Sequence, residues 1–162
     1  MKKLTHIDDE GRASMVDVGG KPATRREAVA SAMVEMSRET LDLVARAELP
    51  KGDVLGTARI AGILAAKKTA DLIPMTHPLQ LTHVGVDFEI DRNRGAILIR
   101  ASARCEGATG VEIEAMTACA IAAVTIYDMC KSVEKGIVIR EVRLEQKSGG
   151  KSGDWNRSED AE

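Results

Sequence analysis

Two segments in the first half of the chain carry apolar residues at the spacing of an amphipathic helix. The first covers residues 24–47, and the second runs from residue 53 to about residue 70. Thr24, followed three residues later by Glu27, has the pattern of a capping box, and Asp53 is the expected N-cap of the second segment. We therefore expect two helices in this half of the chain.

A third helical segment is apolar on every side. Between Glu114 and Asp128 no residue carries a charge, and alanine is frequent. A helix of this composition has no face suited to water, so it belongs in a core or an interface. Charged residues bracket it, with Glu112 and Glu114 at its start and Asp128 and Lys131 at its end. Ionisable groups at the rim of a buried helix are candidates for acid–base chemistry.

Other segments alternate apolar and polar residues with the period of two that marks a half-buried strand. Residues 82–90 and 97–101 do so on either side of a turn at 91–95, which predicts a β-hairpin. Residues 137–144 predict a last strand, and residues 14–18 predict a short early one. The order helix, helix, strand, strand, helix, strand predicts an α+β fold. We expect a ferredoxin-like plait, with a mainly antiparallel sheet and helices packed on one face.

Length and composition predict a single domain over residues 1–155 and a mobile tail over 156–162. A net charge of −2 and only 2% aromatic residues argue against a nucleic-acid partner. The three cysteines, Cys105, Cys119 and Cys130, form no C-x-x-C motif and suit a reducing compartment. No stretch has the about 18 consecutive apolar residues of a membrane span, and the start of the chain does not resemble a secretory signal. We expect a cytoplasmic protein without a membrane partner.

Asp128 and Lys131 are three residues apart, so they share one face of the predicted helix. One interpretation is a surface ion pair of little energetic value. The other is an acid–base pair, because burial lowers the pKa of a lysine, a neighbouring carboxylate raises it again, and the pair can transfer protons near neutral pH. The position at the end of an apolar helix favours the second interpretation.

Glu112 and Glu114 lie in the first turn of the same helix, where the helix dipole alone favours carboxylates. Glu114 and Asp128 are 14 residues apart. This spacing places them on similar faces but about 21 Å apart along the axis, so one reacting atom cannot contact both in a single chain. Either the ligand is long, or a second copy runs antiparallel and brings Glu114 of one subunit toward Asp128 of the other, as in a two-fold dimer.

His77 lies between Pro74 and Pro78 in a loop whose backbone is restricted by both prolines. Such a histidine is either structural or a catalytic or binding group. His77 and His83 are conceivable metal ligands, but the sequence has no Cys/His cluster with zinc spacing, so no metal is expected.

Basic residues gather in three irregular segments. They are, in chain order, Lys21, Arg25 and Arg26, then Lys51, then Lys147 and Lys151. In the last segment, glycines let backbone N–H groups approach a phosphate while the lysines neutralise it. The segment is not a Walker A loop, because Glu145 stands where the first glycine belongs and no helix follows. A polyanion such as a nucleoside triphosphate is a candidate ligand, and a flexible solvated tail is the alternative.

Six motifs, in order along residues 4–155, together resemble the cyclic pyranopterin monophosphate synthase family of molybdenum cofactor biosynthesis. They are Lys51-Gly52-Asp53-Val54, Thr57-Ala58-Arg59-Ile60-Ala61-Gly62, Leu72-Ile73-Pro74 with His77-Pro78-Leu79, Thr109-Gly110-Val111-Glu112, Tyr127-Asp128-Met129-Cys130-Lys131 and Lys147-Ser148-Gly149-Gly150-Lys151-Ser152-Gly153. Each motif alone is weak, whereas the six in order are specific.

The resemblance implies a lyase that acts on 3′,8-cyclo-7,8-dihydroguanosine 5′-triphosphate, which a radical-SAM enzyme supplies. The products would be cyclic pyranopterin monophosphate and diphosphate. The resemblance also implies that the reaction needs no metal and no organic cofactor. It implies a ferredoxin-like domain assembled as a hexamer of three dimers, with active sites at the dimer interfaces.

The resemblance also assigns site residues. The acid–base centre falls on Asp128 and Lys131, and a further catalytic lysine is Lys51. Substrate contacts fall on Met75, Thr76, His77, Glu112, Ile113 and Glu114, and anion contacts on Lys21, Arg26, Lys147 and Lys151, some of them from a neighbouring subunit. Thr76 departs from the family pattern, in which cysteine often precedes the His-Pro pair. Threonine removes any thiol role there but keeps a hydroxyl for hydrogen bonding.

Two other classes of function stay open from the residues alone. A ferredoxin-like domain can sense a nucleotide without chemistry, although a sensor needs no paired acid and base such as Asp128 and Lys131. A structural oligomerisation domain explains the apolar helix, but it explains neither the rigid His77 loop nor the lysine–glycine segment.

Overall fold

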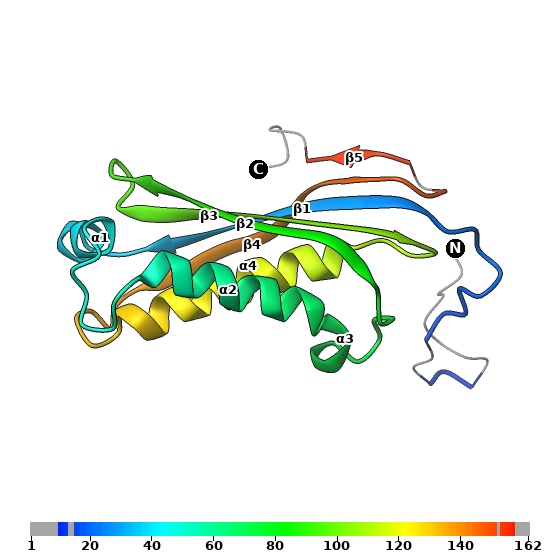
Figure 1. The fold of residues 1–162 in the computed structure, drawn as a ribbon, viewed down its shortest axis with the longest axis horizontal. Coiled ribbons are helices and arrows are strands. Elements are labelled where there is room, and N and C mark those ends of the chain that lie inside the picture. The colour runs from blue at the N-terminus through cyan, green and yellow to red at the C-terminus, as the bar shows by residue number, and fades with distance from the viewer. Residues whose placement is uncertain (1–9, 13–14, 152, 158–162) are drawn as a thin grey trace.

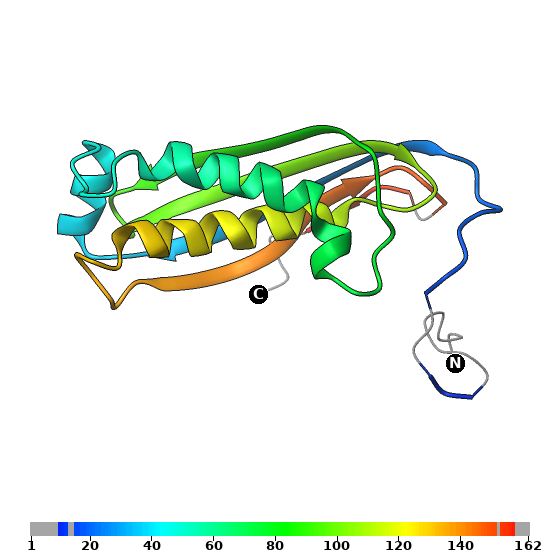
Figure 2. The same ribbon diagram turned by 60° about the horizontal axis from the view of Figure 1, so that its bottom comes forward.

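Two layers make up the molecule: an antiparallel β-sheet and, across one of its faces, a layer of helices (Figure 1). The structure is a computed structural model and describes residues 10–12, 15–151 and 153–157. Its elements are, in chain order, β1 (Thr24–Glu35), α1 (Arg38–Ala45), α2 (Val54–Lys67), α3 (Thr69–Leu72), β2 (Leu81–Asp91), β3 (Ala96–Gly107), α4 (Glu112–Cys130), β4 (Val138–Ser148) and β5 (Trp155–Asn156). The two longest helices, α2 and α4, lie side by side along the sheet (Figure 2).

The sheet has the strand order β2-β3-β1-β4-β5, and each neighbouring pair is antiparallel. Alternate residues of a strand face the same side. The buried rows of β1 and β3 consist largely of small side chains, among them Ala28, Ala30, Ala32, Ala101 and Ala103. Small side chains let the helices lie close to the sheet. The architecture is the ferredoxin-like α+β plait that the sequence predicted, with α2 and α4 on one face.

Residues 24–47 do not form the helix that their spacing predicted. Their first half is the central strand β1, and helix α1 begins only after its N-cap Ser37, whose hydroxyl accepts a hydrogen bond from the N–H of Thr40 at 3.3 Å. The capping box predicted at Thr24 is therefore wrong. Residues 28–34 are apolar at nearly every position, so the apolar pattern fits the spacing of a helix and the alternation of a strand equally well. Pairing with a strand on each side then outweighs the intrinsic preference of alanine for helix.

The other predicted elements are present, with shifted ends. Asp53 is the N-cap of α2, and its carboxylate accepts a hydrogen bond from the N–H of Gly56 at 2.9 Å. The predicted hairpin is β2–β3, the apolar helix is α4 and the last predicted strand is β4. Residues 15–18 form no strand, and residue 14 lies outside the described residues.

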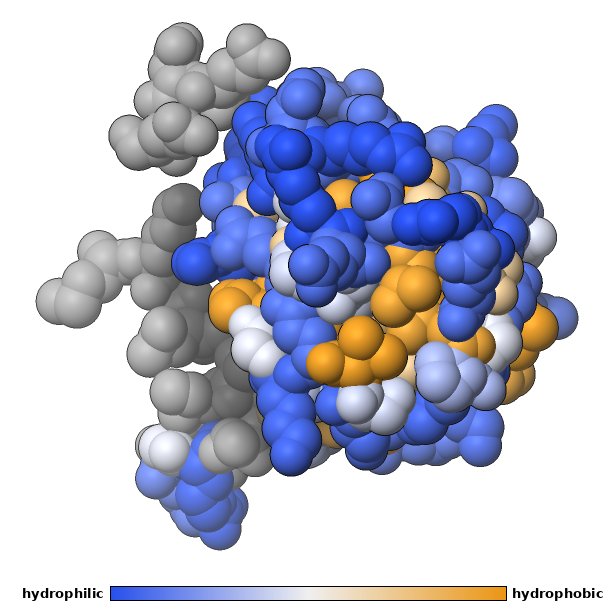
Figure 3. All heavy atoms as spheres, turned by 90° about the vertical axis from the view of Figure 1, so that its left-hand side faces the viewer, coloured by the Kyte–Doolittle hydropathy of each residue, from blue (hydrophilic) through white to orange (hydrophobic). Residues whose placement is uncertain are grey.

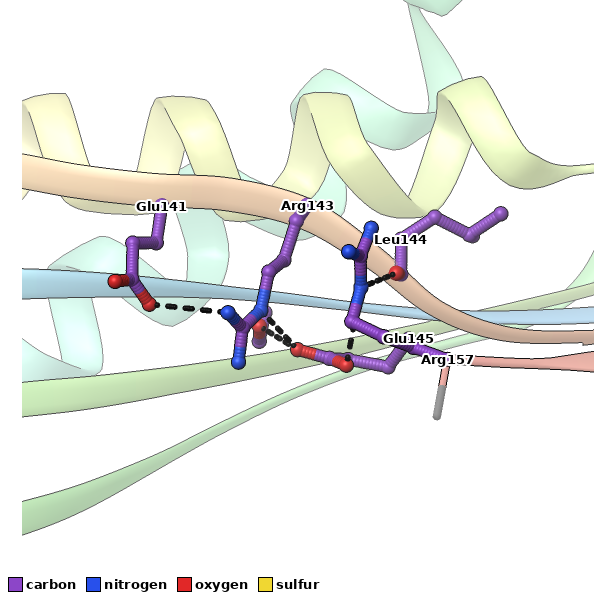
Figure 4. A network of polar contacts seen from close by, with 6 residues as sticks. Glu141, Arg143, Leu144, Glu145 and Arg157 are labelled. Atoms are coloured by element: carbon purple, nitrogen blue, oxygen red, sulfur yellow. Dashed lines mark hydrogen bonds and ion pairs between the residues drawn. The ribbon is translucent and has the colours of Figure 1, made fainter. Parts of the chain in front are cut away.

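A chain of polar contacts runs along β4 on the sheet face away from the helices (Figure 4). Arg143 is 2.8 Å from Glu145 and 3.3 Å from Glu141, which has a positive φ of 54° next to a register shift in the β1–β4 ladder. Arg157 donates to the backbone carbonyl oxygen of Leu144 at 2.9 Å. This bond fastens the chain just after the short edge strand β5.

Strand β5 carries the described structure beyond residue 155. Trp155 pairs with Lys147, and Asn156 pairs with Gln146. Residues 158–162 lie outside the described residues, so the mobile tail over 156–162 stays a prediction, as does the single domain over 1–155.

Helix α4 is the element around which the helical layer packs. Ten of its 19 residues are buried, and it contacts α2, β1, β3 and β4. By length and composition alone it is long enough and apolar enough to cross a membrane, and it is the one helix in the described part of the chain for which this holds. A buried core helix has the same character, and the packing of α4 between the sheet and α2 accounts for its composition.

Gly62 on α2 allows the two long helices to approach each other. A Cβ at this position would lie 2.9 Å from the backbone carbonyl oxygen of Ala118 on α4 and 3.2 Å from Cγ2 of Val86 on β2. No side-chain rotation can relieve the contact with the backbone oxygen. The spacing of α2 and α4 therefore depends on the absence of a side chain at residue 62.

We predict that Gly62→Ala destabilises the fold by about 1–3 kcal/mol. Overpacking outweighs the about 0.5–1 kcal/mol that alanine gains over glycine inside a helix. Urea denaturation at a fixed protein concentration measures the change. Ala61→Gly, at the neighbouring half-buried position, is the control for helix propensity and should cost at most about 1 kcal/mol. A Gly62→Ala protein more stable than wild type would contradict the close packing.

Candidate active site

Lys51, Asp128 and Lys131 form a cluster at the C-terminal end of α4. Asp128 lies in the last turn of the helix, Lys131 is its C-cap, and Lys51 comes from the loop between α1 and α2. The Lys51 ammonium is 2.8 Å from Oδ2 of Asp128, and the Lys131 ammonium is 2.7 Å from Oδ1. Lys51 also donates to the backbone carbonyl oxygen of Asp128 at 2.8 Å. The structure thus brings together the three residues to which the resemblance assigned catalysis.

The two lysines control the charge of Asp128. Hydrogen bonds from Lys131 and Lys51 lower the pKa of its carboxyl from 3.8 to about 2, and the bond to Asp128 raises the pKa of Lys131. The three side chains are between 38% and 52% exposed, so water screens these interactions. Of the two opposing effects expected at Lys131, the carboxylate of Asp128 outweighs burial. At neutral pH Lys131 is a proton donor or a fixed positive charge, and Asp128 is ionised.

The loops at this end of the molecule are tied to one another. Glu134, in the turn after α4, accepts hydrogen bonds from the N–H and the hydroxyl of Ser37 at 3.0 and 2.8 Å. The hydroxyl of Tyr127 donates to the carbonyl oxygen of Lys135 at 3.3 Å. The surface at this end is largely hydrophilic, with hydrophobic side chains gathered among the charged ones (Figure 3). The lysine–aspartate cluster is thus exposed to solvent, while hydrogen bonds between the neighbouring loops hold this end of the molecule together.

Most of the predicted binding residues lie at the opposite end of α4. A cavity of about 480 Å³ is lined by Met75, Thr76, His77, Glu112, Ile113 and Glu114. Nε2 of His77 is 2.9 Å from the carbonyl oxygen of Val16. Because a carbonyl only accepts, this ring nitrogen carries a proton and fixes the orientation of the imidazole. The hydroxyl of Thr76 donates to the carbonyl oxygen of Ile73 at 2.8 Å, and its lone pairs can still accept a hydrogen bond.

A larger cavity of about 800 Å³ adjoins the first. Its wall includes all four predicted anion contacts, Lys21, Arg26, Lys147 and Lys151. The two cavities share Lys21, Thr109, Gly110 and Glu112 as lining residues. The predicted substrate loop and the predicted anion contacts therefore meet at the N-terminal end of α4.

The cavities contain charges of both signs. Nζ of Lys147 is 3.6 Å from Oε1 of Glu112. Glu114 is only 4% exposed, and burial raises the pKa of its carboxyl above the ordinary value. The lysines can neutralise an anion, whereas the carboxyl groups can accept hydrogen bonds from the N–H groups of a base.

Sequence reasoning missed part of the cavity wall. Val16 and Val18 line the smaller cavity from the segment before β1, and Thr24 lines the larger one. The hydroxyl oxygen of Thr24 is buried and has no hydrogen-bond partner within the described residues. Thr24 escaped notice because the same residue was assigned to a helix cap. Thr109 and Gly110 were part of a recognised motif, which was the one available signal for their role.

The two ends of α4 stay apart within one chain. Glu114 and Asp128 belong to the same straight run of helix and are 14 residues apart. That spacing corresponds to about 21 Å along the axis. The lysine–aspartate cluster and the paired cavities are therefore separate features of a single chain.

The described residues contain no group of three His, Cys, Asp or Glu side chains arranged to hold a metal ion. The three cysteines are buried free thiols. Burial raises the pKa of Cys119 to about 12 and that of Cys130 to about 11, which makes both thiols poor nucleophiles.

Fold and site together define an α+β protein with a cavity lined by four cationic side chains and a separate lysine–aspartate cluster. The sequence profile of the MoaC family matches residues 15–150. The chain is 57% identical over 155 residues to the cyclic pyranopterin monophosphate synthase of Chloroflexus aurantiacus. The aligned residues make up 96% of this chain and 95% of the relative. The proteins of the same name from Brucella ovis and Pelotomaculum thermopropionicum are 55% and 56% identical, over 98% and 97% of this chain and 96% and 92% of their own. The chain belongs to the MoaC family.

We predict that the carboxyl of Asp128 titrates at a pKa of about 2 in the folded protein, as measured by carbon-13 NMR of its side chain. Because this value lies below the ordinary 3.8, the ion pairs stabilise the fold above that ordinary pKa and are lost as the pH falls toward the folded value. Lys131→Ala should move the pKa back toward 3.8, whereas Lys135→Ala, in the same turn, should not. An unchanged pKa in Lys131→Ala would show that the ion pair does not control Asp128.

Proposed function

We propose that this protein is a lyase of molybdenum cofactor biosynthesis. It converts 3′,8-cyclo-7,8-dihydroguanosine 5′-triphosphate to cyclic pyranopterin monophosphate with release of diphosphate. The observation that carries the proposal is the identity of 55–57% over nearly the whole chain to proteins named cyclic pyranopterin monophosphate synthase. The adjoining cavities, the lysine–aspartate cluster and the distance between them also support it.

The adjoining cavities suit the two halves of such a substrate. The larger cavity offers Lys21, Arg26, Lys147 and Lys151 to a triphosphate. The smaller cavity offers Met75, Thr76 and His77 on one side and Glu112, Ile113 and Glu114 on the other to the guanine-derived ring system. Carboxyl groups, an imidazole and the main chain can recognise such a ring by hydrogen bonds. The chain has only three aromatic residues, which are too few to form a stacking platform for the ring.

The lysine–aspartate cluster suits the chemistry. A substrate hydroxyl loses its proton to a base of the site or to solvent and attacks the α-phosphorus. The bond from that phosphorus to the bridging oxygen of the β-phosphate breaks, and diphosphate leaves with the bonding electron pair. Lys131, whose raised pKa keeps the ammonium protonated, can neutralise charge that develops on the phosphate and on the departing group. Asp128 holds Lys51 and Lys131 on either side of its carboxylate. We therefore assign Asp128, Lys131 and Lys51 to catalysis.

The separation of about 21 Å along α4 leads us to a site shared between subunits. A second copy related by a two-fold axis would bring its Asp128 end to the cavities of the first. The outer side of the helical layer supports this arrangement, because Ile60, Leu64 and Val124 are each more than half exposed there. Covering such side chains stabilises an interface. We propose a dimer built in this way and a hexamer of three dimers.

The cellular setting follows from the same proposal. The substrate carries an unusual carbon–carbon bond between the ribose and the base, which a radical-SAM enzyme would have to form. Three unpaired buried thiols suit a reducing cytoplasm. The proposed reaction is a rearrangement with a leaving group, and it calls for no metal, no organic cofactor, no nucleic acid and no membrane.

We predict that Lys131→Ala abolishes conversion of the cyclic guanosine-derived triphosphate while the protein stays folded. The side chain is half exposed, so its loss costs little stability, whereas its charge is needed as diphosphate leaves. Diphosphate release and pterin formation by the purified protein measure turnover, and circular dichroism reports the fold. Lys135→Ala removes an exposed lysine of the same turn and should keep wild-type turnover. Near-normal turnover by Lys131→Ala refutes the assignment, and binding without turnover by the wild type favours a nucleotide sensor.

We also predict that two inactive variants restore activity when their subunits are mixed. Lys131→Ala disables the cluster, and Lys147→Ala disables the larger cavity. In a mixed dimer with shared sites, one site carries both changes and the other carries neither, so random mixing should recover about one quarter of wild-type activity. Co-refolding the two variants and measuring turnover tests this. No recovery, in a mixture shown by native mass spectrometry to contain mixed dimers, would place the whole site within one chain.

A further inference from the structure

Arg26 lies where two loops of the larger cavity meet. It belongs to the row of β1 side chains that faces the helices, and toward the middle of the strand this row continues with Ala28, Ala30 and Ala32. The β1–β3 ladder places Arg26 opposite Cys105, close to the end of β3. Arg26 is therefore the charged residue at the outer end of this row of buried alanines, near the N-terminal end of α4.

One of the two loops connects β3 to α4. Nε of Arg26 donates to the carbonyl oxygen of Gly107 at 3.2 Å, and Nη2 donates to that of Ala108 at 3.4 Å. These bonds commit one edge of the planar guanidinium to the main chain. Arg26 therefore ties β1 to the connection that continues through Gly110 to Glu112 at the start of α4.

The other loop follows β4 and carries Lys151. A Cβ at Gly150 would lie 1.5 Å from Nη1 of Arg26 and 2.4 Å from its Cζ, so the main chain of Gly150 lies directly against the guanidinium. A Cβ at Gly149 would lie 2.1 Å from the carbonyl oxygen of Arg25. Both glycines have a positive φ, +90° at Gly149 and +77° at Gly150. Side chains at these positions would be strained and would also collide with the Arg25–Arg26 segment.

The end of strand β4, the loop after it and the β3–α4 connection carry the charges of the larger cavity around Arg26. Lys147 and Lys151 flank the glycine pair, and Glu112, at the end of the other loop, is 3.6 Å from Lys147. The β ladders hold Lys147, so a shift of the loop after β4 changes the distance from Lys151 to Lys147 and to the start of α4. The guanidinium sits between the loops as a spacer of fixed shape.

We propose that Arg26, seated against the main chain of Gly149 and Gly150, is a positioning residue that sets the width of the anion cavity. It holds Lys151 at the distance from the strand residue Lys147 that a triphosphate requires, and its main role is to order the two loops rather than to supply one more positive charge. The inference rests on the proposed function for the identity of the ligand. It assigns to the glycine pair the role of leaving room for the guanidinium.

A comparison of two glycines in one loop tests the proposal. Gly150→Ala should weaken binding of diphosphate by about tenfold or more, because small displacements of binding groups have effects of this size or larger. Gly153 is the matched control: it also has a positive φ, of +66°, but within the described residues a Cβ there meets nothing within 4 Å. Gly153→Ala should bind diphosphate within about twofold of wild type. Isothermal titration calorimetry with the full chain measures both affinities, and equal affinities of the two variants would overturn the proposal.

Substitution of Arg26 separates shape from charge. Lys keeps the positive charge but not the planar fork, so Arg26→Lys should bind diphosphate about as weakly as Arg26→Ala. In the Arg26→Ala background the collision is gone, and Gly150→Ala should weaken binding no further than Gly153→Ala does. Arg26→Lys with wild-type affinity would show that charge alone matters. If Gly150→Ala does not fold, Arg26→Lys decides the question alone.

Turnover adds a readout that general destabilisation does not produce. Gly150→Ala should raise KM for the triphosphate substrate by about tenfold, with kcat within about threefold of wild type. The two proposals fail separately. A wild-type protein that binds diphosphate in the predicted pattern but forms no pterin contradicts the reaction only. If the wild type turns over normally and Gly150→Ala and Gly153→Ala have the same KM, the positioning role alone is contradicted.

Discussion

The burial of helix α4 is the constraint on which the rest of the structure depends. The helix can lie close to the sheet because the facing rows of β1 and β3 are largely alanine, and close to α2 because residue 62 is glycine. Apart from Glu114 and Thr117, its buried residues are apolar, and its charged residues lie only at its two ends. Packing of the core thereby fixes where the chemistry of this chain can be placed.

The two ends of α4 provide different physical environments. At the C-terminal end, Asp128 is about half exposed and is held ionised by Lys51 and Lys131. At the N-terminal end, Glu114 is buried, with a raised pKa, beside two adjoining cavities. Under the proposed function, the lysine–aspartate cluster and the cavities are each incomplete without the other. A site formed where two subunits meet would combine them, and it would use the exposed apolar side chains of α2 and α4 for the contact.

The success of the sequence predictions followed the strength of the local pattern. The β2–β3 hairpin was predicted because its alternation of apolar and polar residues is clear on both sides of a turn. Helix α4 was predicted because a long stretch rich in alanine carries no charge. Residues 24–35 were assigned to a helix because a strand that is buried on one face and half-buried on the other shows no clear period. Family resemblance named Lys51 as a further catalytic lysine, but its contact with Asp128 spans 77 residues and no local pattern encodes it. The contact of the Arg26 guanidinium with the main chain of Gly150 depends on the path of the loop after β4. The glycines permit this path but do not specify it.

The central claim is that one functional site combines the Asp128 end of one subunit with the cavities of another. The most direct measurement is a crystal structure of the Lys131→Ala protein with the cyclic guanosine-derived triphosphate bound, since this variant should retain its substrate. The account predicts that the triphosphate lies among Lys21, Lys147 and Lys151 of one subunit, with Asp128 and Lys51 of its partner facing the reacting atoms. A substrate enclosed entirely by residues of a single chain would contradict it.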